Sequence, residues 1–287
     1  KTQESRDCVM KPLSFLISFL KYSLSFIIVL ALWEAYARYG GLNELFLPRP
    51  SKIGAKLYSL FVKVEVIEQG TIYWHFYATL AQMSIGFAYG ITIGTTLAVL
   101  AAFNETFRRY VAPYAVVFNV TPGIAVLPLI IAWFGFGWES KIALATLVCF
   151  FPPFINTLTG LLKKNDEAIE LFQTIGATQS QYFWKQQLPN ALPEIFAGLK
   201  LAITTALLGT IVAQFGSATE GVGILMQRFA FRLDMAGSFA SLVTMAIMGL
   251  LVFTVAEVMD RRIVFWRDAK GLERVSRKKQ QKLSANG

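Results

Sequence analysis

Six apolar segments, each of about the length that crosses a lipid bilayer as a helix, dominate the sequence. A crossing helix needs roughly 20 mainly apolar residues, because each residue advances about 1.5 Å through a hydrocarbon core of about 30 Å. The chain is 55% hydrophobic and 16% charged, whereas charged residues average about 25% in soluble domains. The sequence therefore predicts an all-α membrane protein with six transmembrane helices. The predicted spans are 22–38, 80–103, 111–134, 142–162, 194–215 and 238–258.

The basic residues flank these segments. In a soluble protein the net charge of +9 would suggest nucleic acid as a partner,. Here the basic residues are better explained by membrane orientation, because cytoplasmic connections carry an excess of Lys and Arg. This rule predicts that both termini are cytoplasmic, with an N-terminal cytoplasmic or interfacial segment at 1–21 and a basic tail at 269–287. The short apolar stretch 12–20 is either the start of the first span or an interfacial helix.

Two segments carry local packing signals. Gly86, Gly90 and Gly94 recur every four residues in the second span, and small residues at this spacing let another helix approach closely,. Pro48 and Pro50 interrupt any helix before the amphipathic stretch 51–63,. We expect Ser51 to cap that stretch and the stretch to lie on the membrane surface.

The segment 163–190 is polar and aromatic, although it lies between two apolar spans. Asn165 is placed to cap a short helix that has acidic residues in its first turn,. Gly176 suits a left-handed turn that ends this helix near Ile175. Thr178 and Gln181 have the spacing of a capping box, so a second short helix is expected to start there.

The second short helix is expected to carry Tyr182, Phe183 and Trp184 and to stop before Pro189. The fifth span would then start afresh, with Asn190 as its cap and Pro193 in its first turn,. Two interpretations of this pair of helices stay open. It is either a knob that docks into a partner protein or an interfacial loop whose aromatic rings lie among lipid headgroups.

The same segment resembles the cytoplasmic loop signature of the permeases of ABC importers. Glu170, Gly176 and the pair Leu188-Pro189 stand at the offsets of that signature. The sequence departs from it at Leu171 and Phe172, where alanines are usual, and at Gln186, where an aliphatic residue is usual. Four further motifs, LPRPSKIGAKL, TPGIAVLPLIIAWFGFGWESKIA, FFPPFINTLTG and TEGVGILM, are similar to landmarks of the nitrate, sulfonate, taurine and bicarbonate permease group.

This resemblance implies a permease domain of the type I ABC importer fold over residues 22–268. It implies a homodimer in a bacterial inner membrane, two ATPase subunits that hold ATP and Mg²⁺, and an extracytoplasmic substrate-binding protein. The implied ATPase-coupling residues are Glu170, Gly176, Thr178, Tyr182, Phe183, Trp184, Leu188 and Pro189. The solutes of the group include nitrate, bicarbonate, alkanesulfonates, taurine and pyrimidine-type vitamin precursors.

Polar residues within the spans are candidates for the translocation pathway, because polar groups at membrane depth usually face protein or water. An alternative is that the hydroxyls bond back to their own helix and that the asparagines join helices. The prolines are candidates because they can open backbone carbonyls toward a cavity, or they only bend helices. The candidates are Asn119, Thr121, Pro122, Asn156, Thr157, Thr204, Thr205, Thr210 and Gln214.

Three polar positions need separate comment. Gln214 stands where members of the group often have an acidic residue, so either that charge is not needed or the solute differs in charge or polarity. Lys200 is expected near the cytoplasmic end of the fifth span, with its ammonium reaching toward water,. His75 is expected to be a polar interfacial residue rather than a proton relay.

Other functional classes are less well supported. The sequence has no Gly-x-x-x-x-Gly-Lys-Ser/Thr loop, so we expect no cofactor in this chain and no ATPase site of its own,. A membrane enzyme would need a cluster of His, Cys or carboxylate residues at usable spacing, and none is evident. The main alternative is a stand-alone secondary transporter or channel. That class often shows internal repeats or membrane-embedded ion pairs, and the sequence predicts neither.

Overall fold

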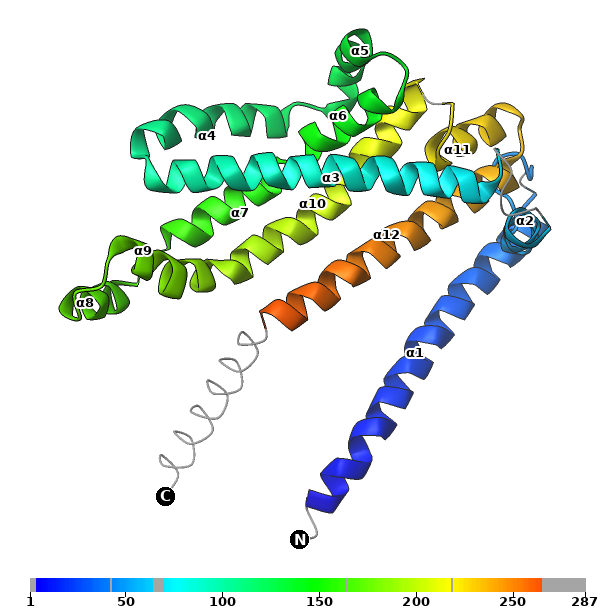
Figure 1. The fold of residues 1–287 in the computed structure, drawn as a ribbon. Coiled ribbons are helices and arrows are strands. Elements are labelled where there is room, and N and C mark those ends of the chain that lie inside the picture. The colour runs from blue at the N-terminus through cyan, green and yellow to red at the C-terminus, as the bar shows by residue number, and fades with distance from the viewer. Residues whose placement is uncertain (1–3, 42, 64–69, 164, 218, 265–287) are drawn as a thin grey trace. The chain divides into compact units, whose positions relative to one another are not determined.

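The fold is helical throughout the part of the chain that the structure describes. In the computed structural model these residues are 4–41, 43–63, 70–163, 165–217 and 219–264 (Figure 1). The predicted all-α class is therefore confirmed. The predicted basic tail, 269–287, lies outside the described residues, as do the first three residues of the predicted N-terminal segment.

The described residues form twelve α-helices and one π-helical segment, joined by turns and short connections. In chain order they are α1 (Glu4–Tyr39), α2 (Pro50–Val62), α3 (Ile72–Phe103), α4 (Glu105–Val120), α5 (Gly123–Phe134), α6 (Trp138–Cys149), α7 (Phe151–Leu162), α8 (Asp166–Thr174), α9 (Gln179–Tyr182), the π-helical η1 (Phe183–Gln187), α10 (Leu188–Ser217), α11 (Val222–Phe231) and α12 (Met235–Ile263).

The chain divides into two compact units. The first comprises the described residues up to Ile72 together with Leu225–Val243. The second comprises Tyr73–Ile224 together with the described residues from Thr244 onward. Each unit is described by itself below.

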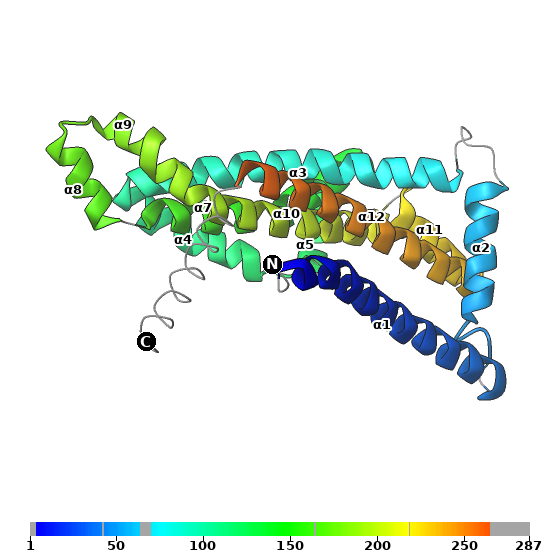
Figure 2. The same ribbon diagram turned by 90° about the horizontal axis from the view of Figure 1, so that it is seen from below.

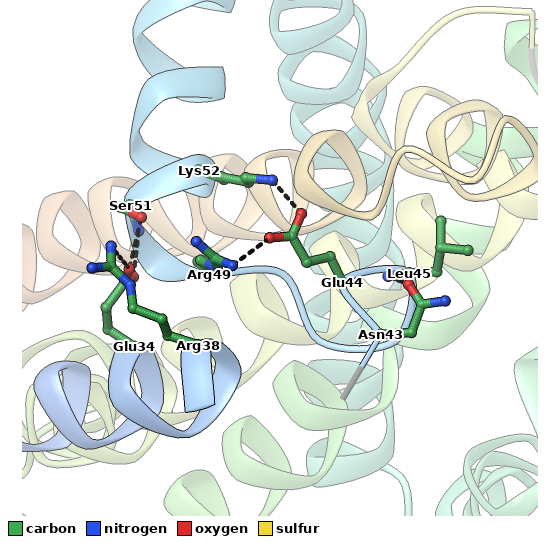
Figure 3. A network of polar contacts seen from close by, with 8 residues as sticks. All are labelled: Glu34, Arg38, Asn43, Glu44, Leu45, Arg49, Ser51 and Lys52. Atoms are coloured by element: carbon green, nitrogen blue, oxygen red, sulfur yellow. Dashed lines mark hydrogen bonds and ion pairs between the residues drawn. The ribbon is translucent and has the colours of Figure 1, made fainter. Parts of the chain in front are cut away.

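In the first unit, a polar network joins the end of α1 to the start of α2 (Figure 3). Glu34 accepts hydrogen bonds from the backbone N–H and the hydroxyl of Ser51, at 3.1 and 3.0 Å, and pairs with Arg38 at 3.3 Å. Glu44 pairs with Arg49 at 3.0 Å and also with Lys52. The hydrogen bond from Lys52 lowers the pKa of Glu44. These contacts fix the turn between the two helices.

The predicted helix cap at Ser51 is wrong. Helix α2 begins one residue earlier, at Pro50, with Arg49 as its N-cap residue. Proline is favoured at the first position of a helix, because its missing N–H would have no partner there and its φ angle already suits the helix. Ser51 is thereby free to bond Glu34 instead.

A further ion pair in the first unit joins α2 to the turn before α12. Lys56 Nζ lies 2.5 Å from Asp234 Oδ2 and 5.0 Å from the centre of the Phe229 ring. Burial alone would raise the pKa of Asp234, but the hydrogen bonds from Lys56 and from the Gly237 N–H outweigh burial and lower it. The stabilisation that the Lys56–Asp234 ion pair gives to the folded protein is therefore present at neutral pH. It is lost as the pH falls through the lowered pKa of Asp234,.

In the second unit, the glycine stripe of α3 packs against α6 and the start of α7, as its spacing predicts. A Cβ atom added to Gly86 would lie 2.5 Å from the Cβ of Ala145, and one added to Gly94 would lie 2.3 Å from the Phe150 carbonyl oxygen. Real Cβ atoms do not approach other atoms this closely, so only glycine permits this helix spacing.

Small residues also bring α10 against α6 and α7, and these helices run side by side in Figures 1 and 2. A Cβ added to Gly198 would lie 2.8 Å from the Cβ of Asn156, and one added to Gly209 would lie 3.0 Å from the Cα of Ala145. Close backbone approach compensates for the weak hydrophobic drive between helices in lipid.

Four helical runs are long and apolar enough to cross a membrane, counting only the residues that the structure describes. They are Ile72–Phe103, Trp138–Leu162, Gln179–Gly216 and Met235–Ile263. A fifth is obtained if α4 and α5 are counted as one broken span. The predicted first span, 22–38, lies within α1, which is not among these runs. The count of six therefore stays a prediction.

The segment predicted as one span at 111–134 is broken in the middle. Helix α4 ends at Val120 and α5 starts at Gly123, with a bend of 100° between them. The residue before a proline is pushed out of the helical region by the proline ring. Accordingly, Thr121 has extended angles (φ −73°, ψ 121°) just before Pro122.

We expect Gly94→Ala to destabilise the protein, because the new methyl group meets a backbone carbonyl that cannot turn aside. The loss should be about 1–3 kcal/mol, as for other overpacked cores. Thermal unfolding of the purified protein in detergent would measure it. Gly54→Ala in α2 is the matched control, since nothing lies within 4 Å of its added Cβ. Equal unfolding temperatures for the two variants would contradict the close approach of α3.

Candidate functional site

Two short helices, α8 and α9, extend beyond the ends of α7 and α10 in the second unit (Figures 1 and 2). We call the segment Asn165–Gln187 the knob. The Asn165 side chain accepts a hydrogen bond from the Ala168 N–H at 3.3 Å, and Asp166 and Glu167 occupy the first turn of α8. The predicted cap is thus confirmed.

The turn between α8 and α9 is also as predicted. Gly176 has φ +67°, the left-handed conformation, in which a residue with a side chain costs about 1–2 kcal/mol,. Thr178 and Gln181 form a reciprocal capping box: the Thr178 hydroxyl accepts from the Gln181 N–H at 3.3 Å, and the Gln181 side chain accepts from the Thr178 N–H at 2.9 Å. The knob therefore has a defined internal geometry.

The three aromatic residues of the knob have different surroundings. The Tyr182 ring packs edge-on against Phe172 of α8, with ring centres 5.5 Å apart, and so closes the knob on itself. The Phe183 ring lies 5.3 Å from that of Phe103 at the end of α3. Trp184 packs on Phe183 but remains 64% exposed. Tyr182 and Phe183 thus serve internal packing, and Trp184 is available to a partner.

The predicted break between the knob and the fifth span is wrong. Helix α10 begins at Leu188, directly after the π-helical segment, and runs on through Pro189 and Pro193. Asn190 lies within the helix instead of capping it. A proline in an α-helix clashes with the carbonyl four residues earlier. A wider π turn precedes Pro189, in which the Leu188 N–H bonds the Phe183 carbonyl, and this widening accommodates the ring.

The knob is fastened to the rest of the unit at its end. Gln187 Nε2 donates to the Leu161 carbonyl oxygen at 2.8 Å, in the last turn of α7. Gln187 was not predictable from the sequence, because its partner lies across a helix pair and leaves no local signal. Together with the Phe103–Phe183 contact, this bond ties the knob to the ends of both α3 and α7.

The outer surface of the knob combines apolar and acidic groups. Leu171 and Ile175 are 59% and 66% exposed, and with Trp184 they are the large apolar side chains open to solvent there. Glu170 is exposed on the same short helix, and no ion pair to it occurs among the described residues. Apolar groups beside an exposed carboxylate suit a partner surface that offers an apolar groove and a basic side chain.

The candidate pathway residues fall into two groups. Thr157, Thr210 and Gln214 are buried. The others have exposed or partly exposed side chains; they are Asn119, Thr121, Pro122, Asn156, Thr204 and Thr205.

Several candidates bond to their own helix, which is the alternative left open above. Thr121 and Thr210 donate their hydroxyls to Val117 and Ala206 carbonyls, at 2.8 and 2.9 Å. Asn156 Nδ2 donates to the Pro152 carbonyl at 2.9 Å.

Gln214 is the centre of a buried hydrogen-bond network. Its Nε2 donates to Gln82 Oε1 at 2.8 Å and to the Thr79 hydroxyl at 3.0 Å. Its Oε1 accepts from the Gly223 N–H at 2.9 Å. Gln214 thereby joins α10 to α3 and to the start of α11. With no exposed surface, it is placed to hold helices together.

The interfacial position of His75, in the first turn of α3, stays a prediction, and the structure adds the packing around its ring. His75 is 2% exposed, and its Nδ1 accepts a hydrogen bond from the Gly221 N–H at 2.9 Å. An acceptor nitrogen at Nδ1 carries no proton, so the bond fixes the tautomer of the ring. His75 thus extends the Gln214 network along the first turn of α3 and holds the segment that enters α11.

One further expectation about charge is corrected. Lys200 does not reach toward water alone: its Nζ lies 2.6 Å from Asp260 Oδ2 and 3.0 Å from Glu257 Oε2. Asp260 lies beyond the sixth span predicted at 238–258, so the expectation that membrane-embedded ion pairs are absent stays a prediction. The sequence signal was a lone lysine in one apolar helix and two acids spaced three residues apart in another.

Comparison with known proteins identifies relatives over most of the chain. The family described as "Binding-protein-dependent transport system inner membrane component" matches residues 90–265. The formylaminopyrimidine transport permease protein ThiX of Halalkalibacterium halodurans is 34% identical, over 86% of this chain and 96% of that protein. The taurine transport system permease protein TauC of Escherichia coli is 27% identical, over 83% and 86%.

Two more comparisons extend this picture. The putative aliphatic sulfonates transport permease protein SsuC of Bacillus subtilis is 28% identical, over 84% of this chain and 86% of that protein. Among solved structures, an inward-facing MetNI methionine ABC transporter matches with a TM-score of 0.59 at 20% identity, over 66% of this chain and 94% of that chain. At this identity the likeness concerns the fold, and it supports the predicted type I permease fold.

We expect Gln214→Leu to destabilise the protein, because it leaves the buried Gly223 N–H and Gln82 side chain without these partners. A buried polar group that loses its partner costs about 1–3 kcal/mol. Thermal unfolding in detergent would measure the loss. Gln173→Leu on the exposed face of α8 is the control and should change stability by no more than about 0.5 kcal/mol. An equally small effect at Gln214 would show that the network does not hold the helices together.

Proposed function

The chain belongs to the family of binding-protein-dependent transport system inner membrane components, and we propose that two copies of it form the translocation pathway of an ABC importer. It is a transport component and not an enzyme. In the proposed assembly, two ATPase subunits bind ATP and Mg²⁺ on the cytoplasmic side, and a substrate-binding protein delivers the solute on the other side. Both termini and the knob would be cytoplasmic, in agreement with the distribution of basic residues.

The knob carries the proposal for energy coupling. Its exposed Leu171, Ile175 and Trp184 and its exposed Glu170 form a surface for an ATPase subunit. Gly176 and the Thr178 capping box give this surface a fixed shape. Leu188 and Pro189 continue it into α10 without a break. A push on the knob would therefore act directly on a long helix that packs along α6 and α7.

The single observation that carries this proposal is the continuity of knob and helix. A flexible loop would absorb a displacement, whereas a helical connection transmits it. The π-helical η1 provides such a connection between α9 and α10.

For the solute, we propose a pyrimidine-type vitamin precursor before a sulfonate or taurine. The formylaminopyrimidine permease is more similar to this chain than the sulfonate and taurine permeases are, at 34% identity against 28% and 27%. The candidate pathway residues are neutral amides and hydroxyls, which suit the polar edges of a heterocycle. Asn119, Asn156 and Thr204 retain exposed or partly exposed side chains and stay in the proposed pathway.

We expect Ile175→Asp to weaken binding of the ATPase subunit by about tenfold or more, which corresponds to about 1.4 kcal/mol, because it places a charge in an apolar contact at the centre of the proposed interface. Co-purification of a co-expressed, tagged ATPase subunit from membranes would measure it. Val62→Asp is the matched control, since Val62 is a similarly exposed apolar residue at the end of α2 (61% against 66%). If both variants retain the ATPase equally, the knob is not the coupling site.

We expect the cognate binding protein to be stabilised by a formylaminopyrimidine and not by taurine or an alkanesulfonate. A ligand at 100 times its dissociation constant adds about 2.7 kcal/mol to the free energy of unfolding. A thermal-shift measurement on the purified binding protein, with each compound in turn, tests this. A shift with taurine or the sulfonate alone would overturn the proposed solute class and leave the permease assignment intact.

A further inference from the structure

An ion pair connects α10 to the end of α12 within the second unit. Lys200 Nζ lies between two carboxylates, 2.6 Å from Asp260 Oδ2 and 3.0 Å from Glu257 Oε2. The Asp260 side chain has no exposed surface, and those of Lys200 and Glu257 are 19% and 30% exposed. Asp260 therefore lies inside the helix packing and the other two side chains lie at its edge, in two of the helices that are long enough to cross a membrane.

Apolar contacts continue this connection along the two helices. A Cβ added to Gly249 would lie 3.1 Å from Leu207 Cδ2. Val252 packs against the cluster that contains Ala202 and Ala206. Because Leu207 meets Gly249 and Lys200 meets Asp260, the helices run in opposite directions along this contact. The ion pair thus lies at one end of a continuous contact between α10 and α12.

The position of the pair relates it to the knob. Lys200 lies about 18 Å along the axis from Leu188, the first residue of α10, since each helical residue advances about 1.5 Å,. Any displacement of the knob that turns or shifts α10 therefore also acts on Lys200.

The Asp260 carboxylate is the buried charge of this group. Removing Lys200 takes away a cation 2.6 Å from this carboxylate, which is unfavourable for a charge with no exposed surface,. The pair Arg109–Glu105 in α4 is different, because its side chains are 76% and 62% exposed and belong to one helix. Such exposed pairs contribute little to stability.

We propose that Lys200 is a positioning residue for transport: it holds the end of α12 on α10, so that both helices move as one body when the knob is displaced. The proposal rests on the proposed docking of the knob on an ATPase subunit. It adds that the movement is passed on to α12, a helix that the knob does not lead into. Lys200 itself touches no solute in this role.

The test measures the distance between the two helices in two states of the complex. Spin labels would be attached to Leu201→Cys and Val258→Cys, at exposed positions of α10 and α12, in a chain that carries Cys8→Ser. Cys149 is buried and is left in place. Pulsed electron paramagnetic resonance would be recorded on the reconstituted complex with its ATPase, without nucleotide and after trapping with ATP and vanadate.

With Lys200 present, we expect the same distance within one chain in both states. With Lys200→Met, we expect the two states to differ. A distance that changes in the presence of Lys200 would overturn the proposal, and so would an unchanged distance in Lys200→Met. Failure of the unsubstituted chain to retain the ATPase would instead refute the coupling site on which the proposal rests.

A second measurement separates positioning from mere stabilisation. In Lys200→Met, we expect uptake per ATP hydrolysed to fall by about tenfold, a typical size for coupling between sites, while ATP hydrolysis continues. The double variant Lys200→Glu/Asp260→Lys again places one cation between two carboxylates and should restore uptake. Arg109→Met, which removes only the exposed pair, is the control. If uptake, hydrolysis and unfolding temperature all fall together, and the double variant does not restore uptake, Lys200 only supports the fold.

Discussion

The close approach of α3 to α6 and α7 is the constraint on which the second unit depends. Inside a bilayer, backbone groups must be paired within each helix, and the hydrophobic effect gives little attraction between helices. Attraction then has to come from contact between backbones, and Gly86, Gly90 and Gly94 permit it along three turns of α3. Gly198 and Gly209 do the same for α10. The helices are thus held in close contact because these glycines have no side chain that would keep the backbones apart.

Helix surfaces lined by glycine could pack together in many arrangements. Polar contacts between the helices then select one of them. Gln214 is satisfied only when α3, α10 and the start of α11 are all in place, since its partners come from each of them. Lys200 and Asp260 impose the same requirement on α10 and α12. A buried polar group without its partner is costly, so each of these contacts makes a sliding movement of the helices unfavourable.

Whether a contact could be predicted from the sequence depends on how far apart its two residues lie along the chain. The Asn165 cap, the Gly176 turn and the Thr178 capping box were predictable, because each is completed within three or four residues. The glycine stripe was predictable as a surface but not as a contact with α6 and α7. His75, Gln187, Gln214 and Lys200 were misread or missed, because their partners stand more than twenty residues away or on another helix. Two predictions at prolines were wrong in opposite ways. Hydropathy predicted one span across Pro122, where the structure has a break between α4 and α5. A helix was expected to stop before Pro189, which lies instead within α10.

The two prolines have opposite effects on how a movement passes from one helix to the next. At Thr121–Pro122 the helix turns by 100°, so a movement of α4 is not passed along its axis to α5. At Pro189 the preceding π turn keeps the helix continuous, so a movement of the knob is passed to α10. Under the proposed function, force would enter at α8 and α9, travel along α10, and reach α12 through Lys200. The bend at Pro122 would leave α5 outside this path, with only its side-chain contacts to α6 and α10 to respond.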